Sequence, residues 1–542
     1  MEPTRRRQQR REARRHQRPL PHQRPAPTLA ALICALLAPA GCKVGPDFTR
    51  PPATVTPAWH AAAGDPRVAT QTAVDALWWK GFADPTLDHL IQLGMAQNLP
   101  LQIAGLRILE ARAQMAVATG MQFPQTQLAF ASAMAIGLSK NAVDLASAAG
   151  VPQRFGTFAV GFDASWELDF WGKYRRGVEA EANNMLATVA DYYASVVSLT
   201  AEIARTYVTI RTDEVLLEQA RQNAKLQEDA LGIAQARFQN GATSELDPAQ
   251  ASTLLESTRA TIPQLDMELQ QARNALATLL GQSADAVATM LNGPRTIPHA
   301  PEKVTVGVPA EILRRRPDVR SAELAAAAQC ARVGVAKAQL YPSFTLLGTI
   351  GLQSSTAGVA SKNLFSTSAV FYSAGPQINW PFLNYGRLTN SVRVEDARFQ
   401  QLLIAYRQTV LKAVQEVEDA LAGYVNGAET ARFEKASVEA AQRSADIALA
   451  QYREGATDYQ RVVDAQRQLL QQQNNLAGAS SSVATSVIAL YKALGGGWEV
   501  QEAPAVPAQT QQEMQQRTNW GTMLSQPSTA SGGQSSTAPA SH

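Results

Sequence analysis

The sequence predicts a membrane protein of α+β class, in which three copies form a twelve-stranded transmembrane β-barrel continued by a barrel of twelve long helices. Three observations support this prediction: an export signal at the start, two pairs of segments with alternating apolar residues, and a very long helical pattern that occurs twice. Each half of the chain is then expected to hold two strands followed by a long helical hairpin, so that the chain is an internal duplication.

Residues 1–41 have the composition of a signal peptide. They carry nine Arg and two Glu and contain the apolar run Thr28–Ala38, which is too short to span a bilayer but has the length of a signal-peptide core. The whole chain has a formal charge of +3 and residues 1–41 contribute +7, so their removal leaves −4. A mildly acidic mature chain argues against nucleic-acid binding.

Cys42 follows the small residue Gly41, which resembles the end of a bacterial lipoprotein signal. Pro39 departs from that pattern, because an aliphatic residue is preferred three positions before the cysteine. We expect Cys42 to be acylated, for example with palmitate, and to begin a Pro-rich tether over residues 42–84. An ordinary export signal with an incidental cysteine is the alternative.

Strict alternation of apolar and polar residues predicts strands at about 125–138 and 155–168, and again at about 343–353 and 368–380. In the first pair the apolar residues occupy even positions: Leu128, Phe130, Met134, Ile136 and Leu138, then Phe158, Val160, Phe162, Trp166 and Leu168. Each strand should therefore turn one apolar face to lipid. A small soluble sandwich is the alternative.

Four strands cannot close a barrel, and open sheet edges do not survive in lipid. Neighbouring copies must therefore complete the wall, and three copies would supply twelve strands, a number found in closed barrels. We accordingly expect a homotrimer.

Long helical patterns follow each strand pair and predict hairpins over 172–291 and 386–495. In the first, apolar residues recur at alternating steps of three and four, as in helices packed along their length. They are Leu186, Val189, Tyr193, Val196, Ile203, Tyr207, Ile210 and Leu217, with Thr200 and Glu214 in the two remaining slots. A rod-like dimeric coiled coil is the alternative.

The duplication is visible in matching segments. Trp171–Lys173 corresponds to Tyr385–Arg387, and Gly241–Thr243 corresponds to Gly455–Thr457, with the same spacing along the chain in both cases. We therefore divide the chain into a first repeat at 85–300 and a second at 301–497. Residues 498–542 are rich in Gln, Ser, Thr, Pro and Ala, and we expect a disordered tail.

Five segments in order carry a family resemblance over about residues 42–496. They are VGPDFTRP (Val44–Pro51), WWKGFADPTLDHLI (Trp78–Ile91), WELDFWGKYR (Trp166–Arg175), RRRPDVRSAE (Arg314–Glu323) and DAQRQLL (Asp464–Leu470). Together they resemble the outer membrane factor family, the TolC-like lipoprotein channels of tripartite efflux pumps. The resemblance implies a trimeric outer membrane channel with a periplasmic tunnel, a periplasmic adaptor, and an inner membrane pump of the resistance–nodulation–division type. It also implies a passive conduit for drugs or other small molecules and a role in antibiotic resistance.

The resemblance places a periplasmic gate at the two turns of the hairpins. Acidic residues that constrict the pore in relatives correspond to Asp247 and Asp464, although Asp247 could instead be a helix N-cap before Pro248 and Asp464 a solvated outer-face residue. Tyr452 matches a position that latches the closed end, and Gln460 stands where relatives often carry an apolar constriction residue. The expected adaptor contacts are Gly241, Ala242, Thr243, Gly455, Ala456 and Thr457.

The sequence offers no enzyme motif. It has six His and neither a phosphate loop nor an HExxH motif, and its cysteines lack metal-ligand spacing. We expect no catalysis, no metal and no cofactor beyond the lipid on Cys42. Two alternatives to efflux stay open: a channel for type I protein secretion, and a trimeric lipoprotein scaffold or adhesin without a pore.

Overall fold

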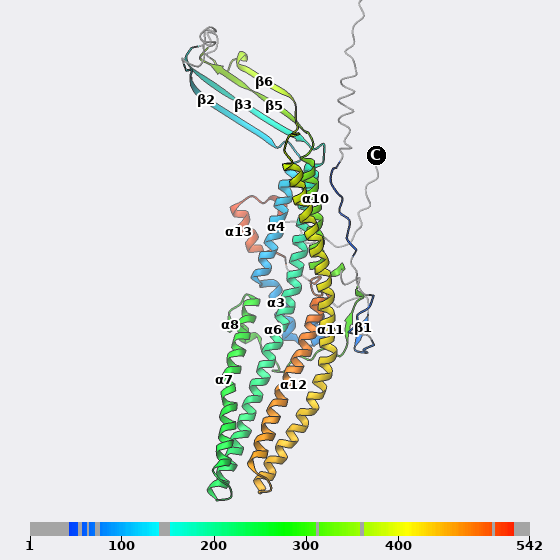
Figure 1. Cartoon of the computed structure of the whole chain (residues 1–542). Helices are drawn as coiled ribbons and strands as arrows, with labels where there is room; N and C mark the ends of the chain where they lie inside the picture. The colour runs from blue at the N-terminus through cyan, green and yellow to red at the C-terminus, as the bar shows by residue number, and fades with distance from the viewer. Residues whose placement is uncertain are drawn as a thin grey trace, which may run out of the picture.

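The computed structural model describes residues 43–52, 57–61, 64–70, 76–139, 152–309, 314–357, 363–500 and 504–524. The expected signal peptide, Cys42 and the end of the tail after residue 524 lie outside these ranges. A single sheet stands at one end of an elongated molecule, and helices run from it to two hairpin tips at the other end (Figure 1).

The sheet contains four antiparallel strands in the order β2-β3-β5-β6. Their bounds are Thr126–Gly137 for β2, Arg154–Leu168 for β3, Ser343–Ser355 for β5 and Val370–Asn379 for β6. Strands β2 and β6 form the two edges, and neither edge is paired with another strand among the residues that the structure describes. This is the open arrangement that the sequence predicted to need neighbouring copies.

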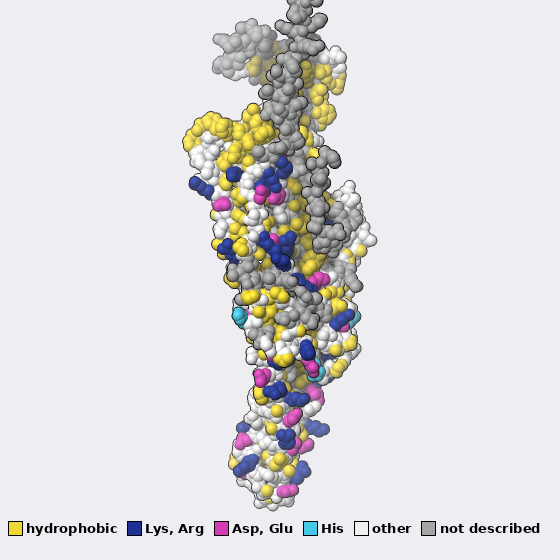
Figure 2. Space-filling view, turned by 90° about the vertical axis from the view of Figure 1, so that its right-hand side faces the viewer, with side chains coloured by type: hydrophobic (Ala, Val, Ile, Leu, Met, Phe, Trp, Pro, Cys, Tyr) yellow, Lys and Arg dark blue, Asp and Glu magenta, His cyan; other side chains and the backbone are white. Residues whose placement is uncertain are grey.

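The register of β3, β5 and β6 gives the sheet one strongly apolar face. Phe162 lies opposite Ile350, which in turn lies opposite Tyr372, and residues directly opposite each other share a face. These three side chains are 67%, 58% and 80% exposed in the single chain. Figure 2 shows hydrophobic side chains gathered at the sheet end of the molecule, whereas charged side chains are spread along the helices down to the tips. Large apolar side chains exposed across a sheet are expected where a membrane barrel meets lipid.

Strand β2 differs from our expectation. Leu128 lies opposite Asp163, and Phe130 lies opposite Gly161. The even-numbered apolar residues of β2 therefore share a face with the polar, odd-numbered residues of β3, and β2 turns alanines to the lipid side. We had expected the apolar sets of both strands on one face. That expectation was wrong because alternation reveals a period of two but not the pairing register.

Two helical hairpins make up most of the chain. The first is α6 (Lys173–Gln239) with α7 (Leu246–Leu280), and the second is α11 (Arg387–Glu454) with α12 (Tyr459–Ala493). Helices α6 and α11 have 67 and 68 residues, which at 1.5 Å per residue is about 100 Å each. No helix in the described ranges is long and apolar enough to cross a membrane.

Shorter helices flank these hairpins beneath the sheet. They are α3 (Pro85–Gln97), α4 (Leu99–Gly120), α8 (Ala284–Met290) and α10 (Pro317–Ala338). Helix α10 packs between α6 and α11, and α4 packs on α6. The hairpins are thereby held together near the sheet, while their tips extend away from it (Figure 1).

The heptad stripe of α6 is buried, as the sequence predicted. Val196, Ile203 and Ile210 are fully covered within the main hydrophobic core. Glu214, one of the two polar residues in the stripe, is also buried and forms ion pairs of 2.7 Å with Arg211 and 2.9 Å with Arg273. A buried carboxylate is tolerated at this position because both of its oxygens have charged partners.

Two segments near the middle of the helices form a small belt. Strand β1 (Val68–Thr70) pairs in parallel with β4 (Val304–Val306), and the indole of Trp59 donates a hydrogen bond of 2.9 Å to the carbonyl of Gly307. These contacts tie the N-terminal segment to the link between the two repeats.

The C-terminal segment is more ordered than we expected. In place of a disordered tail from residue 498, helix α13 (Ala508–Arg517) lies against α4. Val506 and Met514 pack on Leu109 in a small apolar cluster. Composition alone missed this helix because a few apolar residues suffice to attach it.

Candidate functional site

The tips of the two hairpins lie next to each other at the end of the molecule farthest from the sheet (Figure 1). Ala234 and Leu254 of the first hairpin form one apolar cluster with Tyr452, Tyr459 and Val462 of the second. The cluster brings the predicted gate residues of both repeats into one region.

Tyr452 connects the two hairpins directly. Its side chain is 1% exposed, and its hydroxyl donates a hydrogen bond of 2.9 Å to Asp247 at the start of α7. The same carboxylate oxygen accepts a hydrogen bond from Thr243. Burial, and then the hydrogen bond to Asp247, raises the pKa of Tyr452 far above its usual value, so the phenol keeps its proton. Asp247 is not an N-cap, since Glu245 occupies that position, and the alternative weighed from the sequence is therefore wrong.

Arg237, which the sequence analysis did not single out, covers Tyr452 from the last turn of α6. Its guanidinium carbon lies 4.7 Å from the centre of the Tyr452 ring, and it donates hydrogen bonds to the backbone carbonyls of Tyr452 and Arg453. Tyr459 packs edge-on against the Tyr452 ring, with 4.9 Å between the ring centres. We call Arg237, Asp247 and Tyr452 the tip latch.

A signal for Arg237 was present in the duplication. At the spacing that relates Gly241 to Gly455, Arg237 and Phe238 correspond to Gln451 and Tyr452. Each repeat thus supplies one member of the Arg237–Tyr452 pair, and the fold places the two members together.

Gln460 and Asp464 form a second, exposed contact. Gln460 donates a hydrogen bond of 2.8 Å to Asp464 one turn later, and accepts one of 3.0 Å from Gln250 of the first hairpin. Asp464 and Asp247, predicted to act alike, are therefore in different environments: Asp247 is half-buried in the tip latch, and Asp464 is exposed on α12.

The two turns have the same backbone geometry. Gly241 and Gly455 adopt positive φ angles of 71° and 81°, which side-chain-bearing residues rarely adopt. In each turn the amide of the next residue, Ala242 or Ala456, donates to a carbonyl of the preceding helix's last turn. The glycines and alanines are exposed, and Thr243 and Thr457 are half-buried.

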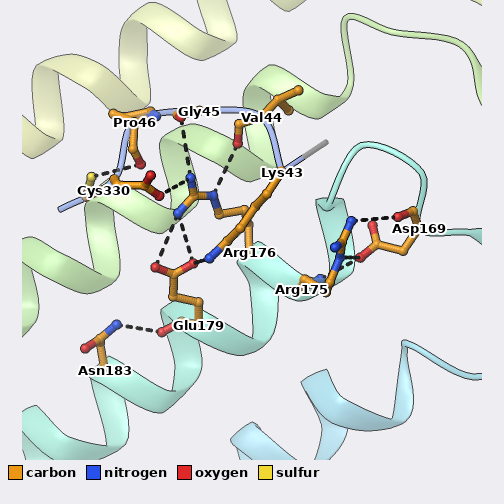
Figure 3. A network of polar contacts seen from close by, with 11 residues as sticks. Lys43, Val44, Gly45, Pro46, Asp169, Arg175, Arg176, Glu179, Asn183 and Cys330 are labelled. Atoms are coloured by element: carbon orange, nitrogen blue, oxygen red, sulfur yellow. Dashed lines mark hydrogen bonds and ion pairs between the residues drawn. The ribbon is translucent and has the colours of Figure 1, made fainter. Parts of the chain in front are cut away.

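A separate site holds the residues that follow Cys42. Arg176, in the first turn of α6, is 1% exposed and is surrounded by this segment (Figure 3). It donates hydrogen bonds of 3.2 Å and 3.4 Å to the carbonyls of Val44 and Gly45, and it forms an ion pair of 2.7 Å with Asp47. Glu179 accepts from the same guanidinium at 3.0 Å. Arg176 thus satisfies its donors largely on the tether, and we call these contacts the N-terminal clamp.

Close packing supports the N-terminal clamp. Gly45 has a φ of 104°, and a Cβ there would lie 2.5 Å from the Cα of Gly334 in α10. The thiol of Cys330 donates to the carbonyl of Pro46 at 3.5 Å. The expected extended tether is therefore fixed against α6 and α10 over its first residues.

The described residues contain no group of three or more His, Cys, Asp or Glu side chains placed to hold a metal ion. The tip latch and the N-terminal clamp are arrangements of polar groups that connect separate parts of the fold.

Comparisons with known proteins agree with this architecture. The sequence model of the family described as "Outer membrane efflux protein" matches residues 90–282 and 308–496, one segment in each repeat. Nodulation protein T of Rhizobium leguminosarum bv. viciae is 31% identical over 470 residues, which is 87% of this chain and 93% of that protein. The pyoverdine export outer membrane protein OpmQ of Pseudomonas putida is 30% identical over 435 residues, 79% of this chain and 90% of that protein.

A solved structure shows the same fold. The outer-membrane channel OprN superposes with a TM-score of 0.77 at 32% identity, covering 84% of this chain and 100% of that one.

Proposed function

The chain belongs to the outer membrane efflux protein family, and we propose how its own residues anchor, close and dock the channel. It is the outer membrane channel of a tripartite efflux pump, with a trimeric β-barrel continued by a periplasmic helical barrel. It works together with a periplasmic adaptor and an inner membrane pump.

The tip latch is the gate of the resting channel. The hydrogen bond between Tyr452 and Asp247 is the main support for this assignment, because it joins the two hairpins at their free ends. With three copies, three latches would each join the two hairpins of one copy. Asp464 and Gln460, exposed beside them, would add three carboxylates near the opening, which attract cations and disfavour anions.

The adaptor binds the exposed turns. Gly241–Thr243 and Gly455–Thr457 end the molecule, carry small side chains and repeat the same geometry, so six equivalent sites would face a partner in the trimer. The pump is of the resistance–nodulation–division type, as the resemblance implies.

Photo-crosslinking in cells tests this docking site. Crosslinking groups at Ala242 and Ala456 should capture the adaptor, whereas a group at exposed Ala405, in the half of α11 nearer the sheet, should not. Equal capture at all three positions would contradict the assignment.

Cys42 carries the lipid. The N-terminal clamp holds residues 43–47 against the turn between β3 and α6, close to the end of the sheet that faces the helices. A lipid on the preceding residue would then enter the membrane beside the barrel. Mass spectrometry of the mature N-terminus should show acylation that Cys42→Ser abolishes.

We propose a passive conduit without catalysis, whose cargo is drugs or other small molecules. Deletion of the gene should sensitise cells to such compounds, and loss of a secreted protein instead would favour type I secretion. A purified trimer that carries no ion current in planar bilayers would contradict the channel and favour a scaffold.

A further inference from the structure

The two repeats join their helices to the sheet in the same way. Phe123–Pro124, which follow α4, correspond in the duplication to Tyr341–Pro342, which follow α10. In both repeats the amide of the aromatic residue donates a hydrogen bond of 3.2 Å to the carbonyl three residues earlier. The indoles of Trp166 and Trp380 each donate one of 3.2 Å to the carbonyl directly before that aromatic residue. The two junctions are therefore structurally equivalent.

Trp171 connects the first junction to the second within the chain. Its ring stacks on that of Tyr341, with 4.6 Å between the ring centres and 24° between the planes, and its indole donates a hydrogen bond of 2.7 Å to the carbonyl of Pro342. Trp171 follows β3, and Tyr341 precedes β5, which pairs with β3. A turn of the first repeat thus packs on a loop of the second where the two strands meet.

The second repeat offers the same contact to a neighbour. Tyr385 corresponds to Trp171 and follows β6, whereas Phe123 corresponds to Tyr341 and precedes β2. Strands β6 and β2 are the opposite edges of the sheet, so these two rings cannot meet within one chain (Figure 1). Tyr385 is 98% exposed and Phe123 is 62% exposed. Both members of the repeated contact are present in the chain, but on its two open edges.

The backbone of Tyr385 also differs from that of its counterpart. Tyr385 has a φ of 50°, a conformation that bulky residues rarely adopt, whereas Trp171 does not have a positive φ. Such conformations persist where the surrounding structure holds them. The nearly complete exposure of the Tyr385 ring shows that packing within the chain does not hold it. Tyr385 lacks the packing that fixes Trp171.

The helices beneath the sheet place the same two residues side by side in an assembly. Helix α10 packs between α6 and α11, and its counterpart α4 packs on α6. The duplication therefore predicts that α4 also lies against an α11, and the α11 available to it belongs to another copy. Phe123 follows the end of α4 closely, and Tyr385 comes shortly before the start of α11. Placing α4 against that α11 brings the two rings together.

We propose that Tyr385 of one copy stacks on Phe123 of the next copy, as Trp171 stacks on Tyr341 within a copy. The proposal rests on the trimeric channel above and identifies a second copy of this chain as the partner of Tyr385. The Tyr385 hydroxyl takes the place of the indole N–H and donates to the carbonyl of Pro124. Around the trimer, three contacts between copies then alternate with three within copies, at the boundary between the β-barrel and the helices.

The rival partner for an exposed tyrosine at this boundary is lipid, because aromatic residues are enriched at membrane interfaces. Cysteine crosslinking separates the two. Full-length copies carrying Tyr385→Cys or Phe123→Cys are given different tags, produced together and treated with a short bifunctional maleimide. We expect covalent dimers that contain both tags, and none when either variant is produced alone. The matched control is Trp171→Cys with Tyr341→Cys in one chain, which should link within a copy and yield no dimer.

Crosslinking of surface amines reports independently whether the trimer is intact. A trimer that is intact by this measure but gives no mixed cysteine dimer overturns the contact. Absence of a trimer in the wild type would instead contradict the channel architecture itself.

The second test measures the coupling of the two rings through dissociation of the trimer in detergent. One aromatic pair changes an equilibrium about two- to twelve-fold, and three pairs multiply, so Tyr385→Ser should raise the dissociation constant at least about ten-fold. Phe123→Ser should act similarly, and the double variant should be no worse than either single one. Phe365→Ser is the control, because Phe365 is 80% exposed in the link between β5 and β6, at the other end of the sheet.

Tyr385→Trp makes the second repeat match the first and should keep the trimer at least as stable as the wild type. It preserves the test if the serine variants fail to assemble, since a weaker trimer in Tyr385→Trp would contradict the stacked geometry. Unchanged dissociation in Tyr385→Ser, or losses that simply add in the double variant as separate lipid contacts would, overturns the proposal. Conductance of the wild-type trimer tests the channel separately.

Discussion

Replacing Tyr452 with phenylalanine removes one hydroxyl from the tip latch and leaves the ring in place. The ring keeps its contacts with Arg237 and Tyr459, so the apolar cluster is unchanged. The loss is the hydrogen bond to Asp247, which then retains Thr243 as a donor. A hydrogen bond to a charged group contributes about 1.5–3 kcal/mol, and the half-buried position of Asp247 favours the lower figure.

The population of the open state should therefore rise substantially in Tyr452→Phe. A loss of about 1.5 kcal/mol favours the open tip about ten-fold, since about 1.4 kcal/mol is a factor of ten. If the three latches of a trimer must break together, the gain multiplies to about a thousand-fold. Even independent latches would give about a ten-fold rise in the fraction of time each tip is open.

The open probability of single channels in planar bilayers measures this effect. Tyr459→Phe is the matched control, because it removes a hydroxyl from the adjoining ring and leaves the Asp247 contact intact. We expect Tyr452→Phe to open far more often than the wild type, and Tyr459→Phe to behave normally. The reasoning is refuted if the two variants open equally often, or if Tyr452→Phe stays closed while Asp247→Ala opens.

Three further predictions concern other parts of the chain. Asp464→Ala should raise the conductance of the closed channel by removing three exposed carboxylates near the tip, whereas Asp446→Ala, which breaks a similar Gln–Asp contact on α11, should not. Arg176→Ala should speed trypsin cleavage after Lys43 in the folded trimer about ten-fold or more, because the tether loses its hydrogen bonds to the guanidinium; an unchanged rate would mean that other contacts hold it. Burial and neighbouring glutamates raise the pKa of Asp213 from 3.8 to about 6, so the folded state holds this proton more tightly than the unfolded state. Ionised Asp213 then costs stability above about pH 6 and costs nothing below about pH 4, so Asp213→Asn should raise the midpoint of thermal unfolding at pH 7.5 and leave it unchanged at pH 4.

Periodicity predicted the helices well because packing along a helix repeats every turn. The stripe from Val189 to Leu217 could be read from the sequence, including the two polar slots. The partners of those slots could not: Arg273 reaches Glu214 from the next helix along the chain, and only the pairing of α6 with α7 brings them together. The tip latch was predicted only in part for the same reason. Asp247 and Tyr452 were expected at the gate, but Arg237 was not, because only the pairing of the two hairpins brings it to Tyr452.

Strand faces were harder to predict than strands. Alternation located all four strands, but the direction of each apolar set depends on pairing register, which a shift of one residue reverses. For β2 the register places Phe130 opposite Gly161 and not opposite a bulky residue. The helix at Ala508–Arg517 was not predicted, because the composition of a segment is an average over many polar residues. Its attachment depends on only a few apolar contacts, those made by Val506 and Met514.

The N-terminal clamp constrains the order in which the protein can mature. Val44 and Asp47 leave the secretion machinery early, yet Arg176 lies 132 residues after Val44, and the partner of Pro46 lies 284 residues after it. The first residues to arrive in the periplasm must therefore wait, unpaired, until more than half of the polypeptide has followed. Contacts of such long range form late and slowly. Until those partners have emerged, the carbonyls of Val44 and Pro46 can accept hydrogen bonds only from water, so the N-terminal clamp closes after most of the chain has been exported.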